Sequence, residues 1–151
     1  MKILAGNIKQ VADSLGAIVN AIPLEISSAY KLMRIAKKVA LAQEAFEKRR
    51  VIALNEHGKK DKDGNLITAD GKPNGAVVFK GKGQEEFAKA FSILVNEDVE
   101  LDFDPIPLEL LTKRSSGNPY KDKDGEPVTI LPSILLGLEP ILVAEGDEKN
   151  S

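Results

Sequence analysis

One uninterrupted stretch decides the fold: LEISSAYKLMRIAKKVALAQEAFEKRRVIALN, which runs from Leu24 to Asn55 without a proline or a glycine. Alanine, leucine, glutamate, lysine, arginine and glutamine dominate it, and these residues are strong helix formers. Apolar residues recur along it at alternating spacings of three and four, which places them on one face of a helix. They are Leu32, Ile35, Val39, Ala42 and Phe46. The stretch predicts one long helix near residues 24–56.

The same periodicity predicts shorter helices on both sides of this stretch, near residues 8–20, 84–96 and 133–143. Residues 99–103 instead alternate apolar and acidic side chains, which is typical of a half-exposed strand with Val99, Leu101 and Phe103 inward. Asp63-Gly64 and Asn74-Gly75 are hairpin signals, and they predict pairing between residues 66–68 and 76–80. The expected fold class is therefore α+β and mostly helical, with a long central helix and a small antiparallel sheet or hairpin built from segments near residues 66–68, 76–80 and 99–103.

Composition limits the classes of protein to which the chain can belong. A length of 151 residues suits one globular domain, expected over residues 1–144, with a flexible polar tail over residues 145–151. The chain has no cysteine, which excludes disulfides and cysteine-based metal sites. A net charge of −2 and the absence of tryptophan make nucleic acid an unlikely partner. Neither a long apolar run nor a secretory signal is recognisable, so we expect no membrane partner and a cytoplasmic protein.

A near-repeat is the most specific internal feature: KDKDGNLIT begins at Lys60 and KDKDGEPVT at Lys121. Asp-x-Asp-Gly occurs in calcium loops, but an EF-hand needs glycine at its sixth position and glutamate at its twelfth. Counted from the first aspartate of each copy (Asp61 and Asp122), the glycines Gly64 and Gly125 come at the fourth position instead. We therefore expect plain turns, with a weak cation site as the alternative.

Other candidate chemistry is weak. His57 is the only histidine, and no nucleophile motif accompanies it. The segment Gly81-Lys82-Gly83 matches no phosphate-binding fingerprint. Acidic residues gather between Glu97 and Asp104, but a solvent-facing strand edge explains them. We therefore expect no catalytic residue, no cofactor, no metal and no enzymatic activity.

Two groups of residues are candidates for contact with another protein. The first is basic and lies on the long predicted helix: Lys38, Lys48, Arg49 and Arg50. The second lies in the C-terminal helix predicted near residues 133–143, which is apolar on most sides and should therefore be buried in the fold or in an interface. Its members are Leu135, Leu138 and Ile141.

The order of these signals resembles that of a loose group of short, uncharacterised proteins encoded by tailed bacteriophages. The resemblance lies in residues 29–33 and 46–50, His57-Gly58 with the loop after it, and three later segments. Those segments are Glu86-Phe87, Val99-Glu100-Leu101 and Pro105-Ile106-Pro107. The resemblance implies a phage protein in the bacterial cytoplasm, acting as an adaptor or inhibitor that binds a host or phage protein. The alternative is a virion structural or assembly component with repeated subunit contacts.

Overall fold

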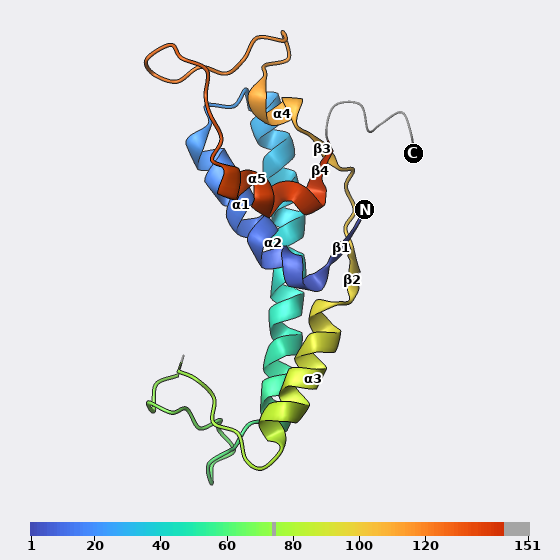
Figure 1. The fold of residues 1–151 in the computed structure, drawn as a ribbon, viewed down its shortest axis with the longest axis vertical. Coiled ribbons are helices and arrows are strands. Elements are labelled where there is room, and N and C mark those ends of the chain that lie inside the picture. Colours follow the sequence, from blue (N-terminus) through green and yellow to red (C-terminus); the bar gives the residue numbers. More distant parts are fainter. Residues whose placement is uncertain (74, 144–151) are drawn as a thin grey trace. The chain divides into compact units, whose positions relative to one another are not determined.

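The computed structural model describes residues 1–73 and 75–143, and these form two compact units. Unit 1 contains the described residues of 1–43 and 98–143, and unit 2 contains those of 44–97. Helix α2 (Ile26–His57) contributes its first part to unit 1 and its last part to unit 2. The expected tail and Asn74 of the second hairpin signal lie outside the described residues. The protein has the expected mostly helical α+β fold (Figure 1).

Three helical segments enclose the core of unit 1: α1 (Ile8–Ala21), the first part of α2, and α5 (Pro132–Leu138). The apolar face predicted for α2 is confirmed there, because Leu32, Ile35 and Val39 are buried. Helices α1 and α5 pack directly against each other (Figure 1). Fully buried side chains from these three segments and from the turn after α5 form this core, and they include Ile8, Val11, Leu15, Ile18, Leu32, Val39, Leu138 and Ile141.

The antiparallel sheet of unit 1 pairs β1 (Lys2–Leu4) with β2 (Asp98–Glu100). The alternation predicted for residues 99–103 is confirmed, since Leu101 is buried while Glu100 and Asp102 are exposed. The expected partner of this strand was wrong. It pairs with the N-terminal segment, in the register Ile3 to Val99, and not with residues 66–68 or 76–80.

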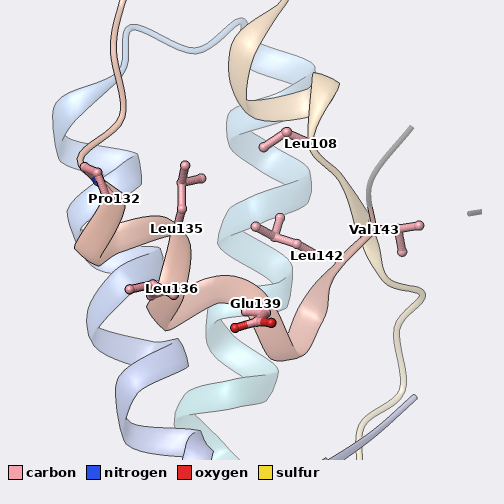
Figure 2. A pocket seen from close by; sticks show the side chains of 7 residues that line it. All are labelled: Leu108, Pro132, Leu135, Leu136, Glu139, Leu142 and Val143. Carbon is pink, nitrogen blue, oxygen red and sulfur yellow. The ribbon is translucent and has the colours of Figure 1, made fainter. Parts of the chain in front are cut away.

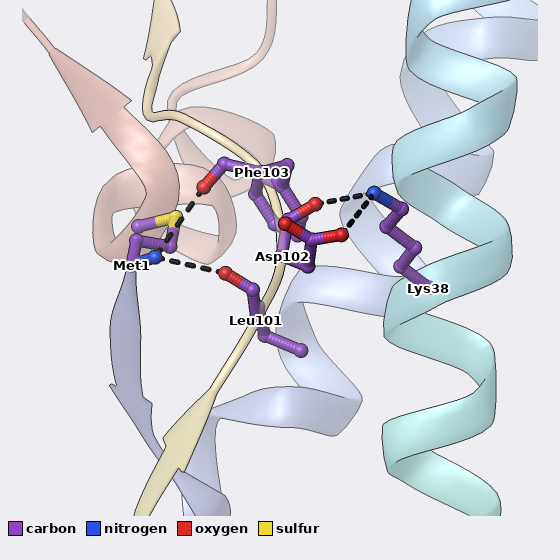
Figure 3. A network of polar contacts seen from close by, with 5 residues as sticks. All are labelled: Met1, Lys38, Leu101, Asp102 and Phe103. Carbon is purple, nitrogen blue, oxygen red and sulfur yellow. Dashed lines mark hydrogen bonds and ion pairs between the residues drawn. The ribbon is translucent and has the colours of Figure 1, made fainter.

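Backbone contacts extend the pairing beyond β2 (Figure 3). The Met1 nitrogen donates hydrogen bonds to the carbonyl oxygens of Leu101 (2.8 Å) and Phe103 (3.4 Å). On the other side of this segment, Lys38 of α2 donates to the Asp102 carbonyl and lies 3.4 Å from its carboxylate oxygen Oδ2. The 101–103 segment is thus held between β1 and α2.

The C-terminal segment of unit 1 contains the helix expected over residues 133–143 in a shorter form, with the interruption that the sequence predicts near Pro140. Helix α5 ends at Leu138, a 3-10 turn (η2, Glu139–Ile141) follows, and β4 (Leu142–Val143) pairs in parallel with β3 (Ile106–Pro107). The cause is Pro140, which has no N–H to continue the helical hydrogen bonds. A short helix, α4 (Glu109–Thr112), follows β3.

Unit 2 is a helical hairpin in which the last part of α2 packs against α3 (Gly83–Val95). Aromatic pairs fill its centre: Phe46 meets Phe91 edge to face at 6.2 Å, and Phe87 stacks with Phe91 at 5.7 Å and with Phe79 at 5.5 Å. The Gly83 Cα lies against the His57 carbonyl, where a side chain would overlap that oxygen. The helix predicted near residues 84–96 is confirmed.

The excursion between α2 and α3 contains the expected hairpin pairing, but only as isolated bridges. Thr68 pairs with Val77, and the Val78 nitrogen donates to the Ile67 carbonyl at 2.9 Å. Neither segment forms a continuous strand in the described residues. The expected three-segment sheet is therefore replaced by the β1–β2 pair in unit 1 and these bridges in unit 2.

Candidate functional site

An apolar groove on unit 1, of about 700 Å³, is the best candidate for a functional site (Figure 2). Helix α5 provides one wall and the β4 segment the other, and Leu108 closes the end near α4. Aliphatic side chains dominate the lining, which consists of Leu108, Pro132, Leu135, Leu136, Glu139, Leu142 and Val143. This surface differs from ordinary exposed helix faces, which are mainly polar.

The packing of α5 on the core fixes which of its residues line the groove. Pro132 occupies the first turn, where its missing N–H breaks no helical hydrogen bond. Gly137 and Leu138 are buried against the core, which turns Leu135 and Leu136 outward. Leu136 remains 65% exposed, and the neighbouring Leu131 is exposed to the same extent. These leucines present apolar area that the described residues do not cover.

The opposite wall is held by the parallel β3–β4 pair. Ile106 is the register partner of Leu142, and the Leu108 nitrogen donates to the Val143 carbonyl at 3.2 Å. The side chain of Ile106 in β3 is fully buried in the core of unit 1. The groove therefore has walls anchored in the core of unit 1, as preformed binding sites usually do.

Glu139 is the one charged residue in the groove lining. Its side chain is exposed and forms no ion pair with any described residue. The groove thus combines a largely aliphatic surface with a single uncompensated negative charge.

The apolar residues singled out from the sequence divide into two groups. Leu135 lines the groove and is half-buried, so it is available to a partner. Leu138 and Ile141 are fully buried in the core of unit 1, and the expectation that they contact another chain is corrected by this burial. Leu136, which sequence reasoning missed, takes the exposed position. The rotation of α5 about its own axis decides which of Leu135, Leu136 and Leu138 are exposed and which are buried.

Each basic residue singled out from the sequence has an acidic partner within its own unit. In unit 1, Lys38 pairs with Asp102 (Figure 3). In unit 2, Lys48 pairs with Glu44 at 3.0 Å, Arg50 pairs with Glu47, and Arg49 forms a bidentate pair with Glu97. These ion pairs neutralise much of the positive charge on the four residues, and that charge would be needed to attract a phosphate or an acidic partner.

The Arg49–Glu97 and Arg50–Glu47 pairs also shift the titration of their members. Hydrogen bonds from Arg49 lower the pKa of the Glu97 carboxyl, and the same contact raises the pKa of Arg49. The Arg50 guanidinium likewise lowers the pKa of Glu47. All four groups remain charged near neutral pH, and their geometry suits structural ion pairs.

The two Asp-x-Asp-Gly copies fold into the same turn. Asp61 Oδ1 accepts hydrogen bonds from the amides of Asp63 (2.9 Å) and Asn65 (3.0 Å). In the second copy, Asp122 Oδ1 accepts from the amides of residues 124 (2.8 Å) and 126 (3.1 Å). In each copy the first aspartate thus supports the turn backbone. Within the described residues, no group of three or more histidine, cysteine or acidic side chains is arranged to hold a metal ion.

His57 ends α2 in unit 2, and its Nδ1 lies 3.3 Å from the Glu86 carboxylate of α3. With the side chain 22% exposed, this contact links the two helices of the hairpin. Gly81-Lys82-Gly83 forms the turn into α3, as expected for a loop before a helix. In unit 1, Glu100, Asp102 and Asp104 line a hollow of about 570 Å³ with exposed side chains.

Comparison with known proteins finds no matching family model, no similar curated protein and no similar solved structure. Among the described residues, no helix has the length and apolar character needed to cross a bilayer.

Proposed function

We propose that the protein is a non-catalytic module that binds another protein through the groove of unit 1. One observation carries the proposal: Leu136 is 65% exposed on the edge of a groove whose lining is aliphatic apart from Glu139. An apolar groove of this kind can accept the apolar face of a helix from another protein. The activity is adaptor-like or inhibitory, and the resemblance to phage proteins favours a host or phage partner in the bacterial cytoplasm.

The lining of the groove specifies the chemistry of its occupant. Leucine, valine and proline side chains accept an apolar ridge, such as the leucine-rich face of an amphipathic helix. The carboxylate of Glu139 favours a lysine or arginine beside that ridge, because opposite charges stabilise the correct register. We therefore expect an amphipathic segment with apolar anchors and at least one basic residue.

A pull-down from bacterial lysate with matched variants tests this proposal. Leu136→Ser removes the exposed groove leucine, whereas Leu41→Ser removes a leucine of similar exposure (66%) from α2, outside the groove lining. We expect a protein that the parent chain and Leu41→Ser retain and that Leu136→Ser loses. Glu139→Lys should weaken the same interaction. Equal retention by all the variants would contradict the proposal.

Self-association through the same leucines is the alternative outcome. Sedimentation of the purified chain distinguishes self-association from binding to another protein. A concentration-dependent oligomer that Leu136→Ser abolishes would favour the assembly component over the adaptor.

A further inference from the structure

We propose that the outer face of the first part of α2, in unit 1, binds an acidic amphipathic helix of another protein. Large apolar side chains of this face remain uncovered by the described residues, since Ile26 is 89% exposed and Leu41 is 66% exposed. The outer face consists of six exposed residues: Ile26, Tyr30, Met33, Arg34, Lys37 and Leu41. None of them lines the apolar groove, so the inference does not rest on the proposed function.

Helical geometry gathers these residues on one side of α2. An α-helix turns by about 100° per residue, which places positions 26, 30, 33, 34, 37 and 41 within an arc of about 100°. The core residues Leu32, Ile35 and Val39 lie on the opposite side, where they are buried. The first part of α2 therefore has two faces with large apolar side chains, and the rest of unit 1 covers only one of them.

The spacing of the outer face suits a second helix. Ile26, Tyr30 and Met33 follow at steps of four and three, and Lys37 and Leu41 continue at steps of four. Steps of three and four are typical of the seam along which one helix packs against another. Tyrosine and arginine are also among the residues that contribute most to binding at protein interfaces. The face thus has the pattern of a helix–helix contact about four turns long.

The charges of this part of α2 specify an acidic partner. Residues 26–43 contain four basic residues and no aspartate or glutamate: Lys31, Arg34, Lys37 and Lys38. Lys38 pairs with Asp102, but the other three form no ion pair with any described residue. Carboxylates beside the apolar residues of a partner helix would complement these cations and fix the register of the contact.

The same charges disfavour two other occupants. A second copy of the outer face would bring like charges together, which opposes association. Helices that lie on a membrane separate a cationic face from an apolar face. Here Arg34 and Lys37 lie between Tyr30 and Leu41 on one face, and the opposite face is buried in the core. A partner helix that carries both apolar and acidic side chains fits this mixed surface best.

Met33 provides a direct reporter of binding, because Met1 is the only other methionine in the chain. The probe is a synthetic helical peptide of about 16 residues, with leucines at steps of three and four and glutamates beside them. A matched peptide carries lysine in place of every glutamate. We expect the glutamate peptide to shift the NMR signal of the Met33 methyl group saturably, and the lysine peptide to leave it unchanged.

Substitutions locate the contact on the outer face. Leu41→Ser and Lys37→Glu should each weaken binding of the glutamate peptide about tenfold, through lost apolar burial and reversed charge respectively. Lys89→Glu reverses an exposed charge on α3, outside the outer face, and should change binding by less than about twofold. Leu136→Ser should also leave it unchanged, so failure of the groove proposal would not affect this result.

Four outcomes would overturn the proposal. The first is the absence of a saturable Met33 shift, and the second is an equal shift with the lysine peptide. The third is a Met33 shift that depends on the concentration of the chain alone, which would assign the face to self-association. The fourth is co-sedimentation with vesicles of phosphatidylglycerol and phosphatidylcholine that Leu41→Ser abolishes, which would assign the face to a membrane surface.

Discussion

Gly137 of α5 lies directly on the Ser14 side chain of α1. A Cβ placed on Gly137 would overlap Ser14 Oγ and approach the Gln10 carbonyl oxygen to 3.3 Å. Ser14 is itself buried at this crossing. The absence of a side chain at position 137 allows the close α1–α5 contact that orients the groove leucines.

Gly137→Ala should therefore destabilise the protein although alanine is the better helix former. Overpacking costs about 1–3 kcal/mol, which exceeds the helix-propensity gain of up to ~1 kcal/mol. Gly16→Ala is the matched control, because a Cβ there meets no atom within 4 Å. It should stabilise the protein by about 0.5–1 kcal/mol. Urea unfolding of both variants measures these changes, and a stable Gly137→Ala would contradict the assigned packing.

The Asp-Gly turns permit a local prediction. Gly64 and Gly125 have φ values of +82° and +79°, so alanine at either position is strained by about 1 kcal/mol. Asp61→Ala removes the acceptor of two backbone amides and should accelerate hydrogen exchange at residues 63 and 65. The equivalent amides at residues 124 and 126 should keep their rates, since Asp122 supports them. Unchanged exchange at residues 63 and 65 would show that Asp61 does not hold the turn.

Acid should weaken the Arg49–Glu97 contact in unit 2. The folded pKa of Glu97 is lowered by hydrogen bonds from Arg49, so its contribution to stability is present above the unfolded pKa. It is lost as pH falls from about 4.3 through the lower folded pKa. Both side chains are substantially exposed, so the effect is small and screened by salt. The difference in melting temperature between the parent and Glu97→Gln at pH 7 should shrink as the pH falls below about 4.3. A difference that keeps its full size through acid would contradict the assignment.

Periodicity predicted the helical part of the fold well. The ends of α1, α2 and α3 lie within about two residues of expectation, because each helix has a regular apolar face and glycine or proline lies at or near most of their ends. Strand β1 was missed because three residues carry no measurable period. The partner of β2 was misassigned for a related reason: pairing between segments about 100 positions apart leaves no local signal.

The groove was only partly predictable. The apolar C-terminal segment indicated an interface, but which leucines are exposed depends on the contact between Gly137 and Ser14, which lie far apart in the sequence. The turn over residues 113–117 was unpredictable in the same way. It has the backbone hydrogen bonds of the Asp-Gly turns, including Gly117 with φ +87°, but Glu25 supports it in place of a local aspartate.

Tyr120 connects the start of α2 to the loop that follows α4. Substituting Tyr120 tests whether this single hydrogen bond stabilises unit 1. The Glu25 amide donates a hydrogen bond to the Tyr120 hydroxyl at 3.2 Å, and the side chain is only 2% exposed. Tyr120→Phe keeps the buried ring but leaves that amide without its acceptor, which should cost about 1–2 kcal/mol.

Tyr30→Phe is the matched control, because Tyr30 is 58% exposed and its substitution should change stability by less than about 0.5 kcal/mol. Denaturant midpoints at unchanged m-value measure both effects. Equal stability of the two variants would mean that the Tyr120 hydroxyl does not hold α2 in place.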